Sequence, residues 1–136
     1  MIKNEKQYRV SKNKLKELHN KLNELKTNKK RTFSQNMVLA SMQNIKEEIE
    51  GEIKAYENLK TSQKIQFKET SIEQLPQLLT EYKIANHLSN KEFSEQLNLK
   101  EQQLQRYEAT GFRGVSFDKL VSFLNKTDLK IKIKVS

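Results

Sequence analysis

The feature that most constrains the fold is a helical period of apolar residues through the first half of the chain. Leucines recur at steps of three, four and three residues over 11–27, at positions 15, 18, 22 and 25. A longer series follows over 34–60, again at steps of three or four, and consists of Val38, Met42, Ile45, Ile49, Ile53, Tyr56 and Leu59. This spacing predicts two amphipathic helices, each with one narrow apolar stripe.

Neither predicted helix is stable alone, because an isolated helix in water has no partner for its apolar stripe. The basic segment 26–31 is predicted to be a loop, and Thr32 with Gln35 fits a capping box that opens the second helix. We therefore expect residues 1–62 to form an antiparallel helical hairpin that also serves dimerisation or partner binding. The residues predicted for that contact are Val38, Met42, Ile45, Ile49, Ile53 and Tyr56.

The rest of the chain has shorter patterns. Residues 63–72 are predicted to be a linker or short strand, and 73–128 a domain of four to five helices, in which Ser89 with Glu92 forms a second capping box. The tail 129–136 alternates apolar residues with lysines, which predicts a half-buried β-strand whose edge is a second device for self-association. The expected fold class is mainly α, with this one C-terminal strand.

Composition argues against several function classes. The chain of 136 residues has no cysteine, and neither His19 nor His87 has further ligands at metal-binding spacing. No phosphate-binding glycine loop or nucleophile motif is present, so we expect no metal, no cofactor and no enzymatic activity. No signal-peptide pattern is visible, and no apolar run approaches the roughly 18 residues of a membrane span. We expect a cytoplasmic protein without a membrane partner.

The formal net charge is +9, from 26 basic and 17 acidic residues. Such an excess favours a polyanionic partner, nucleic acid before membrane. Residues 1–62 hold fourteen basic and eight acidic side chains, net +6, whereas 63–136 hold twelve and nine, net +3. The charge alone therefore does not identify the part that would bind nucleic acid.

The segment KEFSEQLNLKEQQLQRYEA, residues 91–109, contains two short helical patterns separated by a three-residue turn. This is the geometry of a helix-turn-helix, with Asn98 at the bend, where a left-handed backbone is expected. If Leu104 faces the core, steps of 100° per residue direct four side chains away from it: Gln102, Gln105, Arg106 and Ala109. Glutamine pairs with adenine and arginine with guanine in the major groove, so this face is a candidate reader of double-stranded DNA.

The segment from Leu75 to about Leu129 resembles the Xre family, the Cro and phage-repressor type of helix-turn-helix regulator. The resemblance is carried by LTEYKIANHLSNKEFSEQLNLKEQQLQRYEATGFRGVSFDKLVSFL, and two positions depart from the family pattern, Ser94 in place of alanine and Asn98 in place of glycine. It implies an ion pair between Lys83 and Glu108, which we expect to be exposed and to orient the third helix. It implies DNA contacts by two groups: bases by Glu101, Gln102, Gln105 and Arg106, and phosphates by Asn90, Gln103 and Arg113.

These patterns predict a sequence-specific transcriptional regulator, a repressor that binds a palindromic operator as a homodimer. Two alternatives remain open. The N-terminal extension resembles that of a branch of these regulators in which some members are antitoxins, so the chain would then also bind a toxin protein and autoregulate its operon. The other alternative is a coiled-coil interaction module without DNA binding, which the acidic Glu101 and the low local charge leave open.

Overall fold

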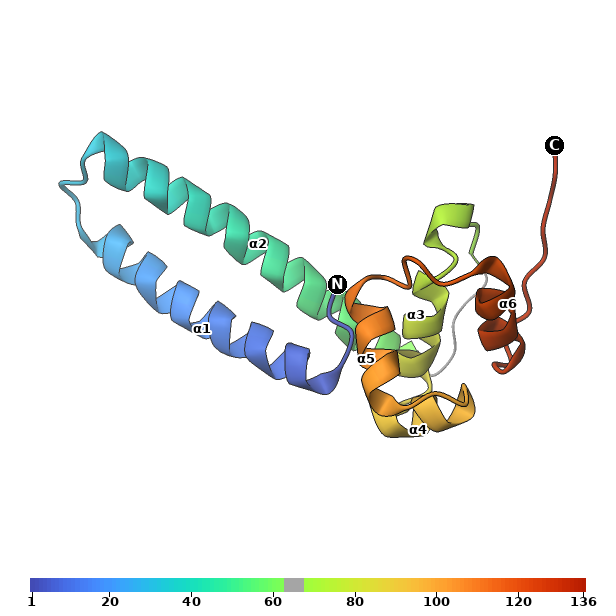
Figure 1. Ribbon diagram of the computed structural model, residues 1–136. Coiled ribbons are helices and arrows are strands. Elements are labelled where there is room, and N and C mark those ends of the chain that lie inside the picture. The colour runs from blue at the N-terminus through green and yellow to red at the C-terminus, as the bar shows by residue number, and fades with distance from the viewer. Residues whose placement is uncertain (63–67) are drawn as a thin grey trace. The chain divides into compact units, whose positions relative to one another are not determined.

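The computed structural model describes residues 1–62 and 68–136 (Figure 1). These residues form six α-helices and one short 3-10 helix, and no strand occurs among them. The chain divides into two compact units, residues 1–58 and 59–136. The strand or linker predicted for 63–72 lies partly outside the described residues, and its described part, from 68, leads into the 3-10 helix η1, Ile72–Gln74.

The first unit contains two long helices that run antiparallel: α1, Glu5–Thr27, and α2, Phe33–Ser62 (Figure 1). The last residues of α2, from Leu59, belong to the second unit. Helix α1 begins earlier than the predicted residue 11. Its start is fixed by Asn4, whose side-chain oxygen accepts a hydrogen bond from the Gln7 N–H at 2.9 Å. The apolar period predicts a helix only where the leucines recur. The N-cap at Asn4 allows the helix to begin earlier, in a mostly polar segment.

The connection between α1 and α2 is closed by side chains. Thr32 and Gln35 form the predicted capping box: the Thr32 N–H donates to Gln35 Oε1 at 2.8 Å, and the Gln35 N–H donates to Thr32 Oγ1 at 3.2 Å. Arg31 donates to the Leu25 carbonyl oxygen at 3.1 Å and to Asn36 Oδ1 at 2.9 Å. The Arg31 guanidinium thus pairs a carbonyl oxygen that has no partner within α1, and it links the end of α1 to the first turn of α2.

At the other end of the hairpin, the two helices are joined by aromatic and acidic side chains. The rings of Tyr8 and Tyr56 stack with centroids 4.9 Å apart. The Tyr56 hydroxyl donates to Glu5 at 3.2 Å, and the Tyr8 hydroxyl donates to Glu57. The hydrogen bond to Glu57 raises the pKa of the Tyr8 phenol above its ordinary value.

The apolar stripe predicted on α2 is divided by this packing. Ile53 and Tyr56 are buried within the chain, and Met42 and Ile49 are half-buried. Val38 and Ile45 remain exposed. The six residues predicted for dimer or partner contact are therefore not one open surface, because the two C-terminal members are already covered.

In the residues that the structure describes, the second unit contains four complete α-helices: α3, Gln77–Ala85; α4, Asn90–Gln96; α5, Glu101–Ala109; and α6, Phe117–Asn125 (Figure 1). One apolar cluster holds these helices together and consists of Leu79, Tyr82, Phe93, Leu97, Leu104, Phe112, Phe123 and Leu124. Every one of the four helices, and the loop before α6, contributes to it. The core thus fixes α4 and α5 against each other and against α3.

The C-terminal strand predicted for 129–136 is wrong. No strand is formed there, and Ile131, Ile133 and Val135 are exposed, whereas Leu129 packs against the core. The alternation of apolar residues and lysines is a valid strand pattern, but a strand needs a neighbouring strand to pair its backbone groups, and the described part of the chain offers none. The described residues therefore present no strand edge of the kind predicted for self-association.

Across residues 1–62 and 68–136, no helix combines the length and the apolar character that crossing a membrane requires.

Candidate nucleic-acid interface

The turn between α4 and α5 is built from local signals in the sequence. Ser89 caps α4 by accepting a hydrogen bond from the Glu92 N–H at 3.1 Å, as its spacing predicts. At the end of α4, Asn98 adopts the predicted left-handed backbone, with φ of 55°. The Leu99 N–H then donates to the Ser94 carbonyl oxygen at 2.8 Å, which closes the turn before α5 starts.

Ser94 also shows why a hydroxyl is tolerated beneath this turn. Its side chain is buried, and its Oγ donates to the Lys91 carbonyl oxygen at 2.8 Å. A buried hydroxyl with a hydrogen-bond partner avoids the desolvation penalty of an unpaired polar group. The turn is further pinned to α6, because Lys126 Nζ donates to the Leu97 carbonyl oxygen at 3.2 Å.

Helix α5 has one buried face and one exposed face. Leu104 and Glu108 are buried, and Tyr107 is half-buried with its ring centroid 6.1 Å from those of Phe112 and Phe123. The opposite face exposes four side chains that together line one shallow hollow of about 370 Å³: Gln102, Gln105, Arg106 and Ala109. Glu101, in the first turn of α5, is exposed as well. The four residues whose outward direction was expected from helical geometry thus share one surface.

Lys83 lies at the centre of a buried polar network behind that surface. Its Nζ is 2.9 Å from Glu108 Oε1 and 3.0 Å from Oε2, and it donates to Asn90 Oδ1 at 2.8 Å. The side chains of Lys83 and Glu108 are only 2% and 4% exposed. The expectation of an exposed pair is therefore wrong: the pair lies inside, where it links α3 and α5 directly and α4 through Asn90.

This network fixes the orientation of the Asn90 amide. Because its oxygen accepts from Lys83, its nitrogen is the end available to donate two hydrogen bonds. Asn90 is half-buried at the start of α4. A donor at a helix N-terminus suits an anionic oxygen.

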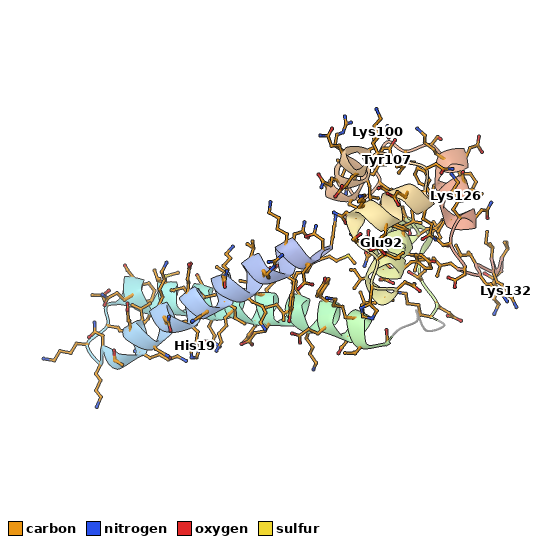
Figure 2. All side chains as sticks on the ribbon, turned by 90° about the horizontal axis from the view of Figure 1, so that it is seen from below. His19, Glu92, Lys100, Tyr107, Lys126 and Lys132 are labelled. Carbon is orange, nitrogen blue, oxygen red and sulfur yellow. The ribbon has the colours of Figure 1, made fainter. Side chains whose placement is uncertain are left out.

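Gln103, which was predicted to contact phosphate, also caps helix α5. Its Oε1 accepts a hydrogen bond from the Lys100 N–H at 3.1 Å, which caps the start of α5. Lys100 itself is exposed immediately before α5, the helix that contains Tyr107; Figure 2 labels both residues. Sequence reasoning missed Lys100 as an exposed cation at the start of α5; its position immediately before the helix was the available signal.

Arg113 projects from a loop held in an uncommon conformation. Gly111, Phe112 and Gly114 all have positive φ, of 63°, 61° and 78°. For a bulky residue such as Phe112 this backbone is strained, and it is held in place because the ring is buried in the core cluster. Arg113, between Phe112 and Gly114, is exposed. The buried ring thus anchors the loop that presents this guanidinium.

The charge around α4 and α5 is balanced. Residues 90–119 contain five basic and five acidic side chains, so the segment has no net charge. Within the described residues, no group of three or more acidic or histidine side chains is placed to hold a metal ion, and His19 is exposed on α1 (Figure 2). The chemistry that this surface offers is hydrogen bonding by amides and a guanidinium.

Comparisons with protein-family models, with curated proteins and with solved structures find no match to this chain.

Proposed function

We propose that the protein is a sequence-specific DNA-binding regulator that inserts α5 into the major groove. The observation that carries this proposal is the exposed face of α5, formed by Gln102, Gln105, Arg106 and Ala109 behind a tight turn from α4. Two short helices joined in this way are the geometry of a helix-turn-helix, whose second helix reads base edges. The resemblance to Xre-family regulators supports the same function.

The chemistry of the face suits base recognition. A glutamine amide donates and accepts at once, which matches adenine N6 and N7, and the arginine fork matches guanine O6 and N7. Ala109 carries only a methyl group, so it permits close approach and can contact a thymine methyl. Each bidentate pair would add about 1–3 kcal/mol of discrimination against the wrong base.

Phosphate contacts would set the register of the helix on DNA. Asn90 supplies amide donors at the start of α4, and Arg113 supplies a guanidinium from the loop anchored by Phe112. Phosphate contacts position a protein without reading sequence, so these residues would affect all DNA sites alike. Glu101 and Gln103 would lie near the start of α5 on DNA. Gln103 would donate to a phosphate from its Nε2 group, while its oxygen accepts the hydrogen bond that caps the helix.

The test is binding of the full chain to a randomised DNA pool, followed by titration of the selected site. We expect Arg106→Ala to weaken the selected site by about 1–3 kcal/mol and to relax preference at one base position. Arg113→Ala should weaken all sequences equally and lower the salt slope by about one. The matched control is Arg9→Ala, at an exposed position on α1. It should leave the base preference unchanged, and it should lower affinity for the selected site only by the small effect of losing one positive charge.

Two results would contradict the proposal. The first is a pool that yields no enriched site, which would favour an interaction module without DNA binding. The second is an unchanged base preference in both Arg106→Ala and Gln102→Ala, which would remove α5 from the reading role.

A further inference from the structure

The N-terminal part of α2 is uncharged and exposes large apolar side chains. Residues 33–45 contain no acidic or basic residue. Phe33 and Met37 in this segment are 79% and 58% exposed. By the helical step of 100°, Met37 points about 160° away from the buried Ile53. These two side chains therefore lie on the outer face of α2, away from the stripe that the sequence pattern marks.

The same outer face has small residues further along the helix. Gly51 lies within a helix of 30 residues, and a Cβ added there would have no atom within 4 Å. The chain itself thus gives no packing reason for a glycine, which is a poor helix former. Ala55, one turn later, is also exposed. A glycine inside a helix permits close approach by another chain.

The large and small residues are spaced symmetrically. Phe33 precedes Asn44 by eleven residues and Ala55 follows it by eleven; Met37 precedes it by seven and Gly51 follows by seven. Steps of four and seven residues are close to whole helical turns, so all five positions fall within about 40° of one another. A two-fold axis at Asn44 would therefore place each large side chain opposite a small one.

We propose that the outer face of α2, formed by Phe33, Met37, Asn44, Gly51 and Ala55, is a dimer interface for a second copy of this chain. The two α2 helices run antiparallel about an axis at Asn44. Phe33 packs over Ala55 of the second copy and Met37 over its Gly51, in both directions. A contact of this kind is isologous: one self-complementary patch serves both copies.

The charges of the hairpin are complementary in this arrangement. Residues 46–57 of α2 contain two basic and five acidic side chains, net −3, whereas the loop 28–32 contains three basic ones and no acidic one. An antiparallel pair sets each acidic segment opposite residues 31–42 of the other copy, which contain one basic and no acidic side chain, and it brings Arg31 of each basic loop opposite Glu57. A parallel pair would instead align the two acidic segments, which repel each other.

Two carboxylates flank the proposed interface, Glu47 and Glu48, and both are exposed. In the antiparallel register they fall opposite Ser41 and Ala40 of the second copy, whose short side chains leave the carboxylates in water. Glu48 and Glu47 thus border the contact without being desolvated by a large neighbour.

The size of the contact predicts its strength. The stretch from Phe33 to Ala55 is about 33 Å long at 1.5 Å per residue, and a helix is about 10 Å wide, which gives roughly 330 Å² for each copy. That is less than half of the about 800 Å² per partner in a stable interface. We therefore expect a weak, reversible dimer. This interface does not depend on DNA binding.

The first test is sedimentation equilibrium of the full chain from micromolar to hundreds of micromolar protein. We expect a monomer–dimer equilibrium that Gly51→Leu and Met37→Glu weaken at least tenfold, since leucine at 51 fills the space proposed for Met37, whereas its Cβ meets no atom of its own chain within 4 Å. Ile45→Glu, on a different face of the same helix, is the matched control and should leave the equilibrium unchanged. Helix content by circular dichroism must be equal in all variants.

The second test fixes the register by cross-linking, because the chain has no cysteine of its own. Under oxidation, Asn44→Cys should give a disulfide-linked dimer, and a mixture of Met37→Cys with Gly51→Cys should give the mixed disulfide. Glu50→Cys, exposed but off this face, should not cross-link.

Three outcomes would overturn the proposal: a wild-type protein that is monomeric throughout, dimerisation lost in Ile45→Glu but kept in Gly51→Leu, or cross-linking by Glu50→Cys in preference to Asn44→Cys. A wild-type protein that stays monomeric and binds a different protein through Phe33 and Met37 would also overturn the proposal. None of these results bears on whether α5 reads DNA, so the two proposals fail separately.

Discussion

Removing one partner of the buried pair between Lys83 and Glu108 should destabilise the second unit strongly. In Glu108→Ala, the Lys83 ammonium stays in a position where its side chain is 2% exposed, and it keeps its hydrogen bond to Asn90 Oδ1. Breaking a buried pair from one side typically costs about 3–5 kcal/mol, because the other charge remains buried. That is a large share of the about 5–15 kcal/mol that stabilises a whole domain.

The double variant Lys83→Met, Glu108→Leu separates the net stability of the pair from its orienting role. Replacing both charges by apolar side chains of similar volume is often neutral or stabilising, by up to about 4 kcal/mol. We therefore expect the double variant to be at least as stable as the wild type. Its Asn90 amide, however, loses the Lys83 donor that fixes it. On the proposed function, the double variant should bind DNA more weakly despite being stable.

Hydrogen exchange measured by mass spectrometry on peptides covering 99–109 is the appropriate assay, because it reports the opening of α5 separately from the hairpin. The wild type, Glu108→Ala and the double variant are compared at one pH and temperature. A loss below about 1 kcal/mol in Glu108→Ala would refute the reasoning, since exposed ion pairs contribute that little and the buried placement would then be wrong. Equal DNA affinity in the wild type and the double variant would refute the orienting role of Lys83 alone.

Two further predictions concern Tyr8 and Asn98. Because the hydrogen bond to Glu57 raises the pKa of the Tyr8 phenol, its stabilisation is complete below about pH 10 and is lost as the pH rises through the folded-state pKa. An ultraviolet titration should show absorbance that develops above about pH 10 and that is missing in Tyr8→Phe; coincident titration of the two proteins would exclude the shift. Asn98→Ala should destabilise the second unit by about 1 kcal/mol, because alanine tolerates the left-handed backbone less well, whereas Asn98→Gly should not; urea denaturation that ranks the two variants the other way would contradict this.

The parts of the structure that sequence reasoning predicted well are those that depend on few neighbouring residues. The capping boxes at Thr32 and Ser89 need one side chain and a backbone group three residues away. The left-handed Asn98 needs only a residue that tolerates that backbone between two helical patterns. The exposed face of α5 follows from the helical period once Leu104 is assigned to the core. Each of these signals is contained in a few adjacent positions.

The features that were missed depend on distant parts of the chain. The burial of Lys83 results from the packing of α3 against both α4 and α5, which no local pattern reveals. The tail has the alternation of a strand, but pairing requires a second strand elsewhere. For the tail the local pattern was real, but its environment was set by other elements.

The distribution of charge connects the two proposals. Residues 1–45 contain eleven basic and three acidic side chains, net +8, whereas 46–136 contain fifteen and fourteen, net +1. Affinity for DNA of any sequence grows with the number of phosphates that a protein neutralises. Because the segment 90–119 has no net charge, it would add little to this sequence-independent affinity. On the proposed function, α5 would therefore supply discrimination and little affinity. Linking two such units raises the effective concentration of the second once the first is bound, without any new contact to DNA. A weak dimer through α2 would thus be sufficient, because binding to two half-sites would itself favour the paired state.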